Sequence, residues 1–222
     1  KQKKRTRATI AKEKGLEELA NTIIEQKDKN NIYEIANKYI NEEKDVRTAE
    51  DAIAGALDII AENISDNAKY RKQIKRTCYL EGMITTKATK PEEKSSYDMY
   101  YEFSEKVNRI PSHRILAINR GEKEEFLKVK IDKPEEKILA SIEKDIIKDE
   151  HSQYTELLKN CIADSFSRLI EPSIDREIRA DLTEKADEQA IKVFGKNAKQ
   201  LLLASPIKGK TVIGFDPAYR TG

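Results

Sequence analysis

The feature that most constrains this sequence is a long helical repeat near its C-terminal end. Apolar residues recur there three or four positions apart: Ile174, Ile178, Leu182, Ala186, Ala190, Val193, Phe194, Ala198, Leu201 and Leu202. A helix rises about 1.5 Å per residue, so such a segment would span about 45 Å, more than the diameter of a small domain. The sequence therefore predicts a rod that joins units, with an apolar face, Phe194 included, packed against a core.

The charged residues of this segment indicate its solvent side. Three pairs of opposite charge lie four positions apart and are expected to form ion pairs: Asp175 with Arg179, Asp181 with Lys185, and Glu188 with Lys192. Each pair stabilises a helix by only a few tenths of a kcal/mol, so the pattern predicts a solvated face and no site. Charged residues make up 37% of the chain and hydrophobic residues 38%, which favours amphipathic helices over an all-β fold.

Shorter periodic stretches complete a mainly α prediction: a multi-helix core with a long spanning helix and a minor β element. Helices are expected at 16–24, 32–40, 49–64, 66–81, 112–120, 135–146 and 154–170. Thr48 and Asp51 have the spacing of a capping box for the helix at 49–64. Gly82 is expected to end its helix in a left-handed conformation, while Ser112 caps the helix at 112–120 and Gly121 ends it.

Two stretches predict the minor β element. Residues 84–86 are rich in β-branched side chains, and residues 126–131 alternate apolar side chains with lysines, as a half-buried strand does. Four aromatic residues between them are expected to pack in the core, with a base-stacking platform as the alternative: Tyr97, Tyr100, Tyr101 and Phe103.

The balance of charge limits how this chain could attract a polyanion. Lys and Arg total 42 and Asp and Glu total 40, so the formal charge is only +2 and any basic surface must be local. Candidate nucleic-acid-binding residues are a basic N-terminal run that begins at Lys1, and two arginines: Lys3, Lys4, Arg5, Arg7, Lys12, Lys14, Arg114 and Arg120. The run is either a phosphate contact or a solvated arm. For the two arginines, salt bridges to nearby glutamates are the favoured interpretation.

Cysteines and histidines give no sign of a metal or catalytic site. Cys78 and Cys161 lie far apart in the sequence, which predicts reduced, structural thiols. His113 and His151 have no partner of nucleophilic or ligand type nearby, and His113 is expected to orient the turn after Pro111 through a hydrogen bond. We therefore expect no catalytic residue, no metal and no cofactor. No apolar run approaches the ~20 residues of a membrane span, so we expect a cytoplasmic protein with no membrane contact.

Three stretches resemble the Tex family of bacterial transcription-accessory proteins, which are distant relatives of a eukaryotic elongation factor. They are KRTRATIAKEKGLEELA at 4–20, PSHRILAINRGE at 111–122, and the stretch that begins PSIDREIR at 172 and ends VIGFDPAYRTG at 222. The sequence departs from the family pattern at Glu18, Asp175 and Ala218-Tyr219. The last departure removes a glycine from the turn after Asp216.

The resemblance implies that this chain is the central part of a longer protein. Residues 1–205 would be the central helical region, and residues 206–222 the first strand of a truncated YqgF (RNase H-like) domain. Most of a helix-turn-helix region, the body of the YqgF domain, a helix-hairpin-helix unit and an OB-type RNA-binding barrel would lie outside it. Asp216 matches the first metal-binding carboxylate of active RNase H-like nucleases, but one carboxylate cannot build a two-metal site.

The favoured hypothesis is a non-catalytic helical scaffold, in a protein that binds nucleic acid through modules mostly outside this chain. The resemblance implies RNA more than DNA as the partner of the whole protein, with RNA polymerase as a second expected partner. Two alternatives stay open: a direct RNA- or DNA-binding module that uses the basic N-terminal run, and a fragment of an RNase H-like nuclease.

Overall fold

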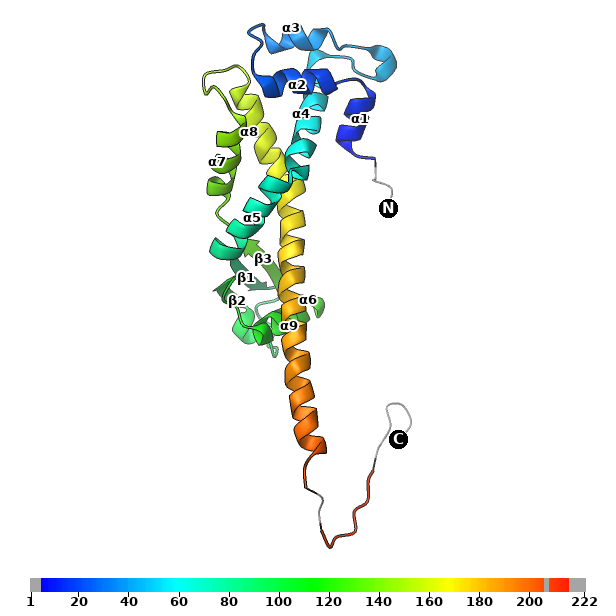
Figure 1. Cartoon of the computed structure of the whole chain (residues 1–222), viewed down its shortest axis with the longest axis vertical. Coiled ribbons are helices and arrows are strands. Elements are labelled where there is room, and N and C mark those ends of the chain that lie inside the picture. The colour runs from blue at the N-terminus through cyan, green and yellow to red at the C-terminus, as the bar shows by residue number, and fades with distance from the viewer. Residues whose placement is uncertain (1–4, 206–207, 216–222) are drawn as a thin grey trace.

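The computed structural model describes residues 5–205 and 208–215. These residues are 63% helical, with a long C-terminal helix and one small three-stranded sheet among them, which confirms the predicted fold class (Figure 1).

The N-terminal end of the molecule is a cluster of short helices around α4 (Ala49–Asp66). α1 (Arg7–Glu13), α2 (Glu17–Glu25) and α3 (Ile32–Asn37) all pack on α4, and a 3-10 turn, η1 (Glu42–Lys44), precedes it. The predicted capping box of α4 is confirmed: Thr48 Oγ1 accepts the amide of Asp51 at 3.1 Å, and Asp51 Oδ2 accepts the amide of Thr48 at 3.2 Å. The two helices predicted at 16–24 and 32–40 are confirmed as α2 and α3, although α3 ends earlier.

α5 (Ala68–Glu81) leads into the sheet through Gly82. The prediction of a left-handed conformation for Gly82 is wrong, because its φ is −71° and its backbone is extended. The glycine is required by space instead: a Cβ there would lie 2.3 Å from the carbonyl oxygen of Cys78. The last turn of α5 therefore lies too close to Gly82 to leave room for a side chain there.

The sheet is antiparallel with strand order β2-β1-β3, and contains β1 (Met83–Ala88), β2 (Glu102–Lys106) and β3 (Leu127–Asp132). Both predicted strands are confirmed as β1 and β3, and β2 was not expected. One face packs on α6 (Ser112–Lys123), where Tyr97, Tyr100, Ile118 and Leu127 form a buried cluster. The expected core role of Tyr97 and Tyr100 is thus confirmed, with a single 3-10 turn, η2 (Asp98–Tyr100), between the strands.

Three predictions for α6 are wrong. Ser112 is its first helical residue and caps nothing, because Pro111 holds the capping position. Gly121 lies inside the helix, where a Cβ would come within 2.7 Å of Leu127 Cδ1, so it permits close packing on β3 and does not end α6. The His113 side chain is exposed and forms no hydrogen bond to any residue in the described part of the chain, so it does not orient the turn.

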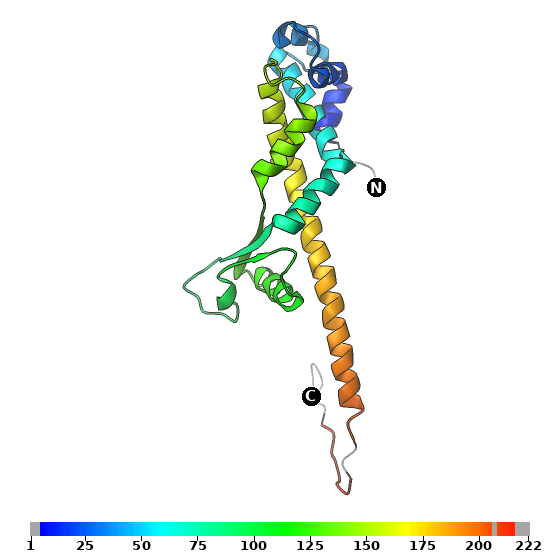
Figure 2. The ribbon, with the colours of Figure 1, turned by 60° about the vertical axis from the view of Figure 1, so that its left-hand side comes forward.

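One continuous helix of 48 residues, which we call the spine, runs over 155–202. It consists of α8 (Thr155–Asp164), a π-helical turn η3 (Ser165–Ile170) and α9 (Glu171–Leu202), and it follows α7 (Glu135–Ile146). Figures 1 and 2 both show α9 passing the sheet and α6 and continuing beyond them.

The predicted burial of the whole apolar face of α9 is wrong. Its buried residues end at Ala186, and Phe194 is 74% exposed. The elements that pack beside α9 extend no further along it than α6. Beyond α6, none of the described residues covers the helix.

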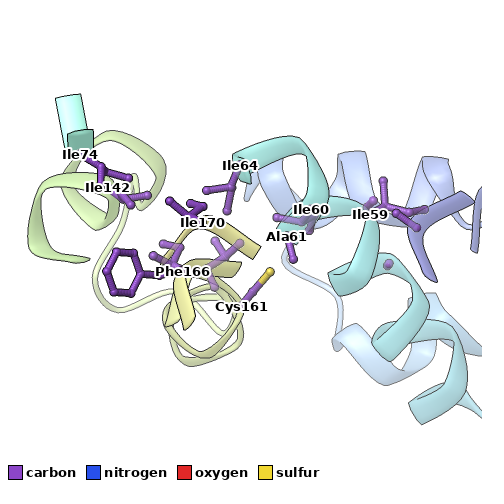
Figure 3. Close-up of a cluster of buried hydrophobic side chains, with 14 of the residues drawn as sticks. Ile59, Ile60, Ala61, Ile64, Ile74, Ile142, Cys161, Phe166 and Ile170 are labelled. Carbon is purple, nitrogen blue, oxygen red and sulfur yellow. The ribbon is translucent and has the colours of Figure 1, made fainter. Parts of the chain in front are cut away.

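The core lies where α4 crosses the spine. Figure 3 shows Ile60, Ala61 and Ile64 of α4 facing Cys161, Phe166 and Ile170 of the spine. A buried hydroxyl and a thiol meet the backbone of α4 here: Ser165 Oγ donates to the carbonyl of Ala61 at 2.6 Å, and Cys161 Sγ donates to that of Leu57 at 3.3 Å.

Both cysteines are expected to be unreactive in the folded protein. Burial raises the pKa of Cys161 to about 12 and that of Cys78 to about 11, so both thiols stay protonated at about pH 8. Ellman's reagent should therefore label neither thiol until urea unfolds the chain, and should then label both. Rapid labelling of either thiol without denaturant would contradict this burial.

The predicted strand near the C-terminal end does not form among the described residues. Residues 210–215 have no regular structure, and Val212, Ile213 and Phe215 are exposed. Asp216 lies outside the described residues, as do Ala218 and Tyr219. The assignment of 206–222 to a following domain stays a prediction.

Candidate functional site

Charged side chains tie the flanking elements to α9. We call this set the polar seam: Arg71, Lys75, Glu122, Lys133, Glu171, Asp175, Glu177, Arg179 and Asp181. Its members come from α5, α6, the link between β3 and α7, and α9. The seam therefore joins elements that are far apart in the sequence to one helix.

Lys133 is the most buried member of the seam, with a side chain only 5% exposed. Its Nζ donates to Asp175 Oδ1 at 2.6 Å and to Glu171 Oε1 at 2.9 Å. Burial alone would lower the pKa of Lys133, but the hydrogen bonds to the two carboxylates outweigh it and raise that pKa, so the ammonium is charged at neutral pH. This contact holds the link between β3 and α7 against the first turns of α9.

Arg179 ties α6 to α9 through a planar, two-point contact. Its guanidinium donates to both carboxylate oxygens of Glu122, at 2.6 and 2.8 Å, and to Asn119 Oδ1 at 2.9 Å. Asn119 in turn donates to Thr183 Oγ1 at 2.8 Å. A bidentate contact fixes orientation as well as distance, so α6 is held at one angle to the spine.

A third contact holds α5. Arg71 donates to Glu177 and, at 2.8 Å, to Ser173 Oγ, while Lys75 pairs with Asp181 at 2.7 Å. Hydrogen bonding to Asp181 raises the pKa of Lys75. The sequence pattern of α9 placed these carboxylates on the solvent side of the helix. In the structure they pair with side chains of other elements.

Two of the three ion pairs predicted within α9 are therefore wrong. Asp175 pairs with Lys133 and Arg179 with Glu122, while Asp181 pairs with Lys75 instead of Lys185. Only the pair of Glu188 with Lys192 is confirmed, at 3.8 Å, where α9 has passed the other elements. Spacing along one helix gives no signal for a partner on another element, and Lys133 was missed for that reason.

Residues 187–202 of α9, which we call the projecting end, leave the body of the molecule. Large apolar side chains are exposed there: Ile191, Val193, Phe194, Leu201 and Leu202. Val193 and Phe194 also line an open groove of about 690 Å³ between α9 and the start of α6. The apolar stripe of the helix thus continues past the point where its cover stops.

The described members of the predicted nucleic-acid-binding set are not brought together. Lys3 and Lys4 lie outside the described residues, and Arg7 is exposed on α1. Three others of the N-terminal run have acidic partners, Arg5 with Glu13 at 2.6 Å, Lys12 with Glu17 at 3.8 Å and Lys14 with Asp45 at 3.5 Å.

The two arginines of α6 lie far along the rod from α1 (Figure 1). Arg114 pairs with Glu105 at 2.6 Å and lies over the ring of Phe103, so the favoured salt-bridge interpretation is confirmed for it. Arg120 is exposed, without a salt bridge to any residue that the structure describes. The predicted residues that the structure describes therefore form no single basic surface.

Over the described ranges, no group of three or more His, Cys, Asp or Glu side chains is placed to hold a metal ion. Nor does any helix within those ranges combine the length and apolar character needed to cross a membrane.

The fold and the seam define a helical rod built on one continuous helix, against which α4, α5, α6 and α7 pack. The family model described as Tex central region-like matches residues 27–194. Three of the relatives that match almost the whole chain show the range of similarity. The YdcI protein of Bacillus subtilis is 50% identical over 100% of this chain and 31% of its own length. The transcriptional accessory protein Tex of Neisseria gonorrhoeae is 32% identical over 100% of the chain and 30% of its own length.

The third relative, from Homo sapiens, is called S1 RNA-binding domain-containing protein 1 and is 32% identical over 99% of the chain and 23% of its own length. The chain therefore belongs to the Tex family, and its residues 27–194 match the central region of that family. It spans between about a quarter and a third of the length of these relatives.

Proposed function

We propose that this central region is the non-catalytic scaffold of a Tex-like transcription accessory protein. Its spine would hold nucleic-acid-binding modules, which lie mostly outside this chain, at fixed positions relative to each other. RNA is the proposed ligand of the whole protein and RNA polymerase its proposed partner. The names of the Neisseria and human relatives, a transcriptional accessory protein and an S1 RNA-binding protein, support this reading.

The projecting end is the observation that carries the proposal. The first half of α9 is packed and locked by the polar seam, whereas the same apolar stripe is bare at Val193, Phe194 and Leu201. Exposed apolar patches of this kind mark interaction surfaces. The proposed occupant is another part of the same polypeptide, because the relatives extend to about three times the length of this chain and, in the sequence, the bare stripe comes just before residues 206–222.

The test compares Phe194→Asp in a full-length Tex-like protein and in the 222-residue chain. Burial of Phe194 by another domain predicts that the substitution lowers the melting temperature and increases proteolysis of the full-length protein. The short chain, in which Phe194 is exposed, should be unaffected. Lys196→Asp is the matched control, because it lies about 200° around the same helix. An unaffected full-length Phe194→Asp protein would overturn the proposal.

Direct nucleic-acid binding by the N-terminal run is supported less well, because Arg5, Lys12 and Lys14 already have acidic partners. The nuclease alternative depends on Asp216, which lies outside the described residues.

A further inference from the structure

The outer face of the sheet carries several lysines close together. Alternate residues of a strand share a face, so the register places Lys87, Lys128 and Lys130 on one side, with Lys106 at its end. We call these four residues the lysine face. All four are exposed, and none of their ammonium groups forms a salt bridge or hydrogen bond with the residues that the structure describes.

This arrangement differs from that of the basic residues that join one element of the body to another. Lys133, Arg179 and Arg114 each have an acidic partner within 3 Å, as expected where charges serve folding. Lys87, by contrast, lies directly opposite Lys128 in the β1–β3 pair. Like charges opposite each other destabilise a strand pair, so the lysine face weakens the sheet that carries it. Such a local conflict is expected at a functional surface.

The shape of the lysine face and its other side chains limit the class of ligand that could bind there. A shallow hollow of about 470 Å³ lies over the strands and includes Thr85 and Ser104 beside the lysines. The sheet has three strands about 4.8 Å apart, so its face is only about 10 Å wide. Glu102 and Asp132 share the face, leaving an excess of two positive charges.

We propose that the lysine face binds the sugar–phosphate backbone of a single-stranded nucleic acid. Lysine binds phosphate as a point charge, and the hydroxyls of Thr85 and Ser104 can donate to phosphate oxygens. None of the described residues offers the face an aromatic ring for base stacking, because Phe103 pairs with Thr86 and its ring contacts Tyr100 and Arg114 on the opposite side, so the contact would not read sequence. A protein partner is disfavoured, since the centre of such an interface is normally apolar or aromatic.

The sheet stands to one side of α9, away from the projecting end (Figure 2). A strand bound here would therefore run beside the spine without competing with a domain packed on Phe194. The proposal does not depend on the scaffold function.

The test measures binding of a labelled oligouridine to the 222-residue chain by fluorescence anisotropy over a range of salt concentrations. The variant carries Lys87→Glu, Lys128→Glu and Lys130→Glu. Its control carries Arg5→Glu, Arg7→Glu and Lys12→Glu, which changes the net charge by the same amount and tests the N-terminal run. A second variant with Gln in place of the three lysines removes charge without adding acids, and circular dichroism checks the fold of each.

We expect the sheet variant to bind at least tenfold more weakly and to have a salt slope smaller by about two, because each single-strand phosphate contact contributes about 0.7. The N-terminal variant should stay within about twofold of the unaltered chain. Equal losses in both variants would show an effect of net charge alone, and unchanged binding by the sheet variants would place the contact elsewhere. Preference for a duplex in competition would overturn the assignment of a single strand.

Discussion

Replacing Phe166 with alanine is expected to lower the free energy of unfolding by about 3 to 5 kcal/mol, the usual loss for a buried phenylalanine. Phe166 is fully buried in the π-helical turn of the spine, beside Ile170 and opposite α4 (Figure 3). The substitution would leave a cavity in the core, where α4 crosses the spine. Urea denaturation followed by circular dichroism would measure the change.

Phe194→Ala is the matched control, because it makes the same substitution further along the same continuous helix. The periodicity of α9 predicts a large loss for it as well, but Phe194 is 74% exposed in this chain. We therefore expect a change within about 0.5 kcal/mol, as for other surface substitutions. Equal losses for Phe166→Ala and Phe194→Ala would mean that something in this chain covers the projecting end.

Replacing Lys133 with methionine is expected to destabilise the chain by about 3 kcal/mol, because it leaves Asp175 and Glu171 without their shared cation. The estimate is at the low end for a buried ion pair, since the two carboxylates keep 29% and 37% of their side-chain exposure. Urea denaturation would measure this loss.

Two further variants test the cause of that loss. Lys192→Met, which breaks the exposed pair with Glu188, should be nearly neutral. Adding Asp175→Leu to Lys133→Met should recover part of the stability, because it removes one unpaired carboxylate. A double variant less stable than Lys133→Met would show that packing, and not the charge, is responsible.

Local patterns in the sequence were enough to predict most of the elements. The capping box of Thr48 and Asp51 and the alternation at 126–131 each depend on contacts between near neighbours, so α4 and β3 form as expected. Periodicity also predicted the apolar face of α9. It could not show where that face loses its cover, because burial of Phe194 depends on how far a separate element extends.

The charged contacts were harder to predict, for a related reason. Asp175 has a candidate partner four residues away in Arg179, yet each pairs with a side chain from another element. The alternation at 126–131 placed Lys128 and Lys130 on the polar side of a strand. Their proximity to Lys87 depends on the register of strands that are distant in sequence, which no local pattern contains.

The continuous spine also limits how the length of this protein can vary in evolution. The alignments to its relatives run over 225 to 244 positions against 222 residues, so the relatives carry insertions. One residue added within α9 would turn everything beyond it by about 100° and advance it by about 1.5 Å. A loop can change its conformation to accommodate an insertion, whereas an insertion in a helix rotates and shifts everything that follows it. Insertions should therefore fall in loops such as 89–96 and 147–153. The number of residues between Asp175, the partner of Lys133, and Phe194 should stay fixed, because that number sets the direction in which the bare stripe faces.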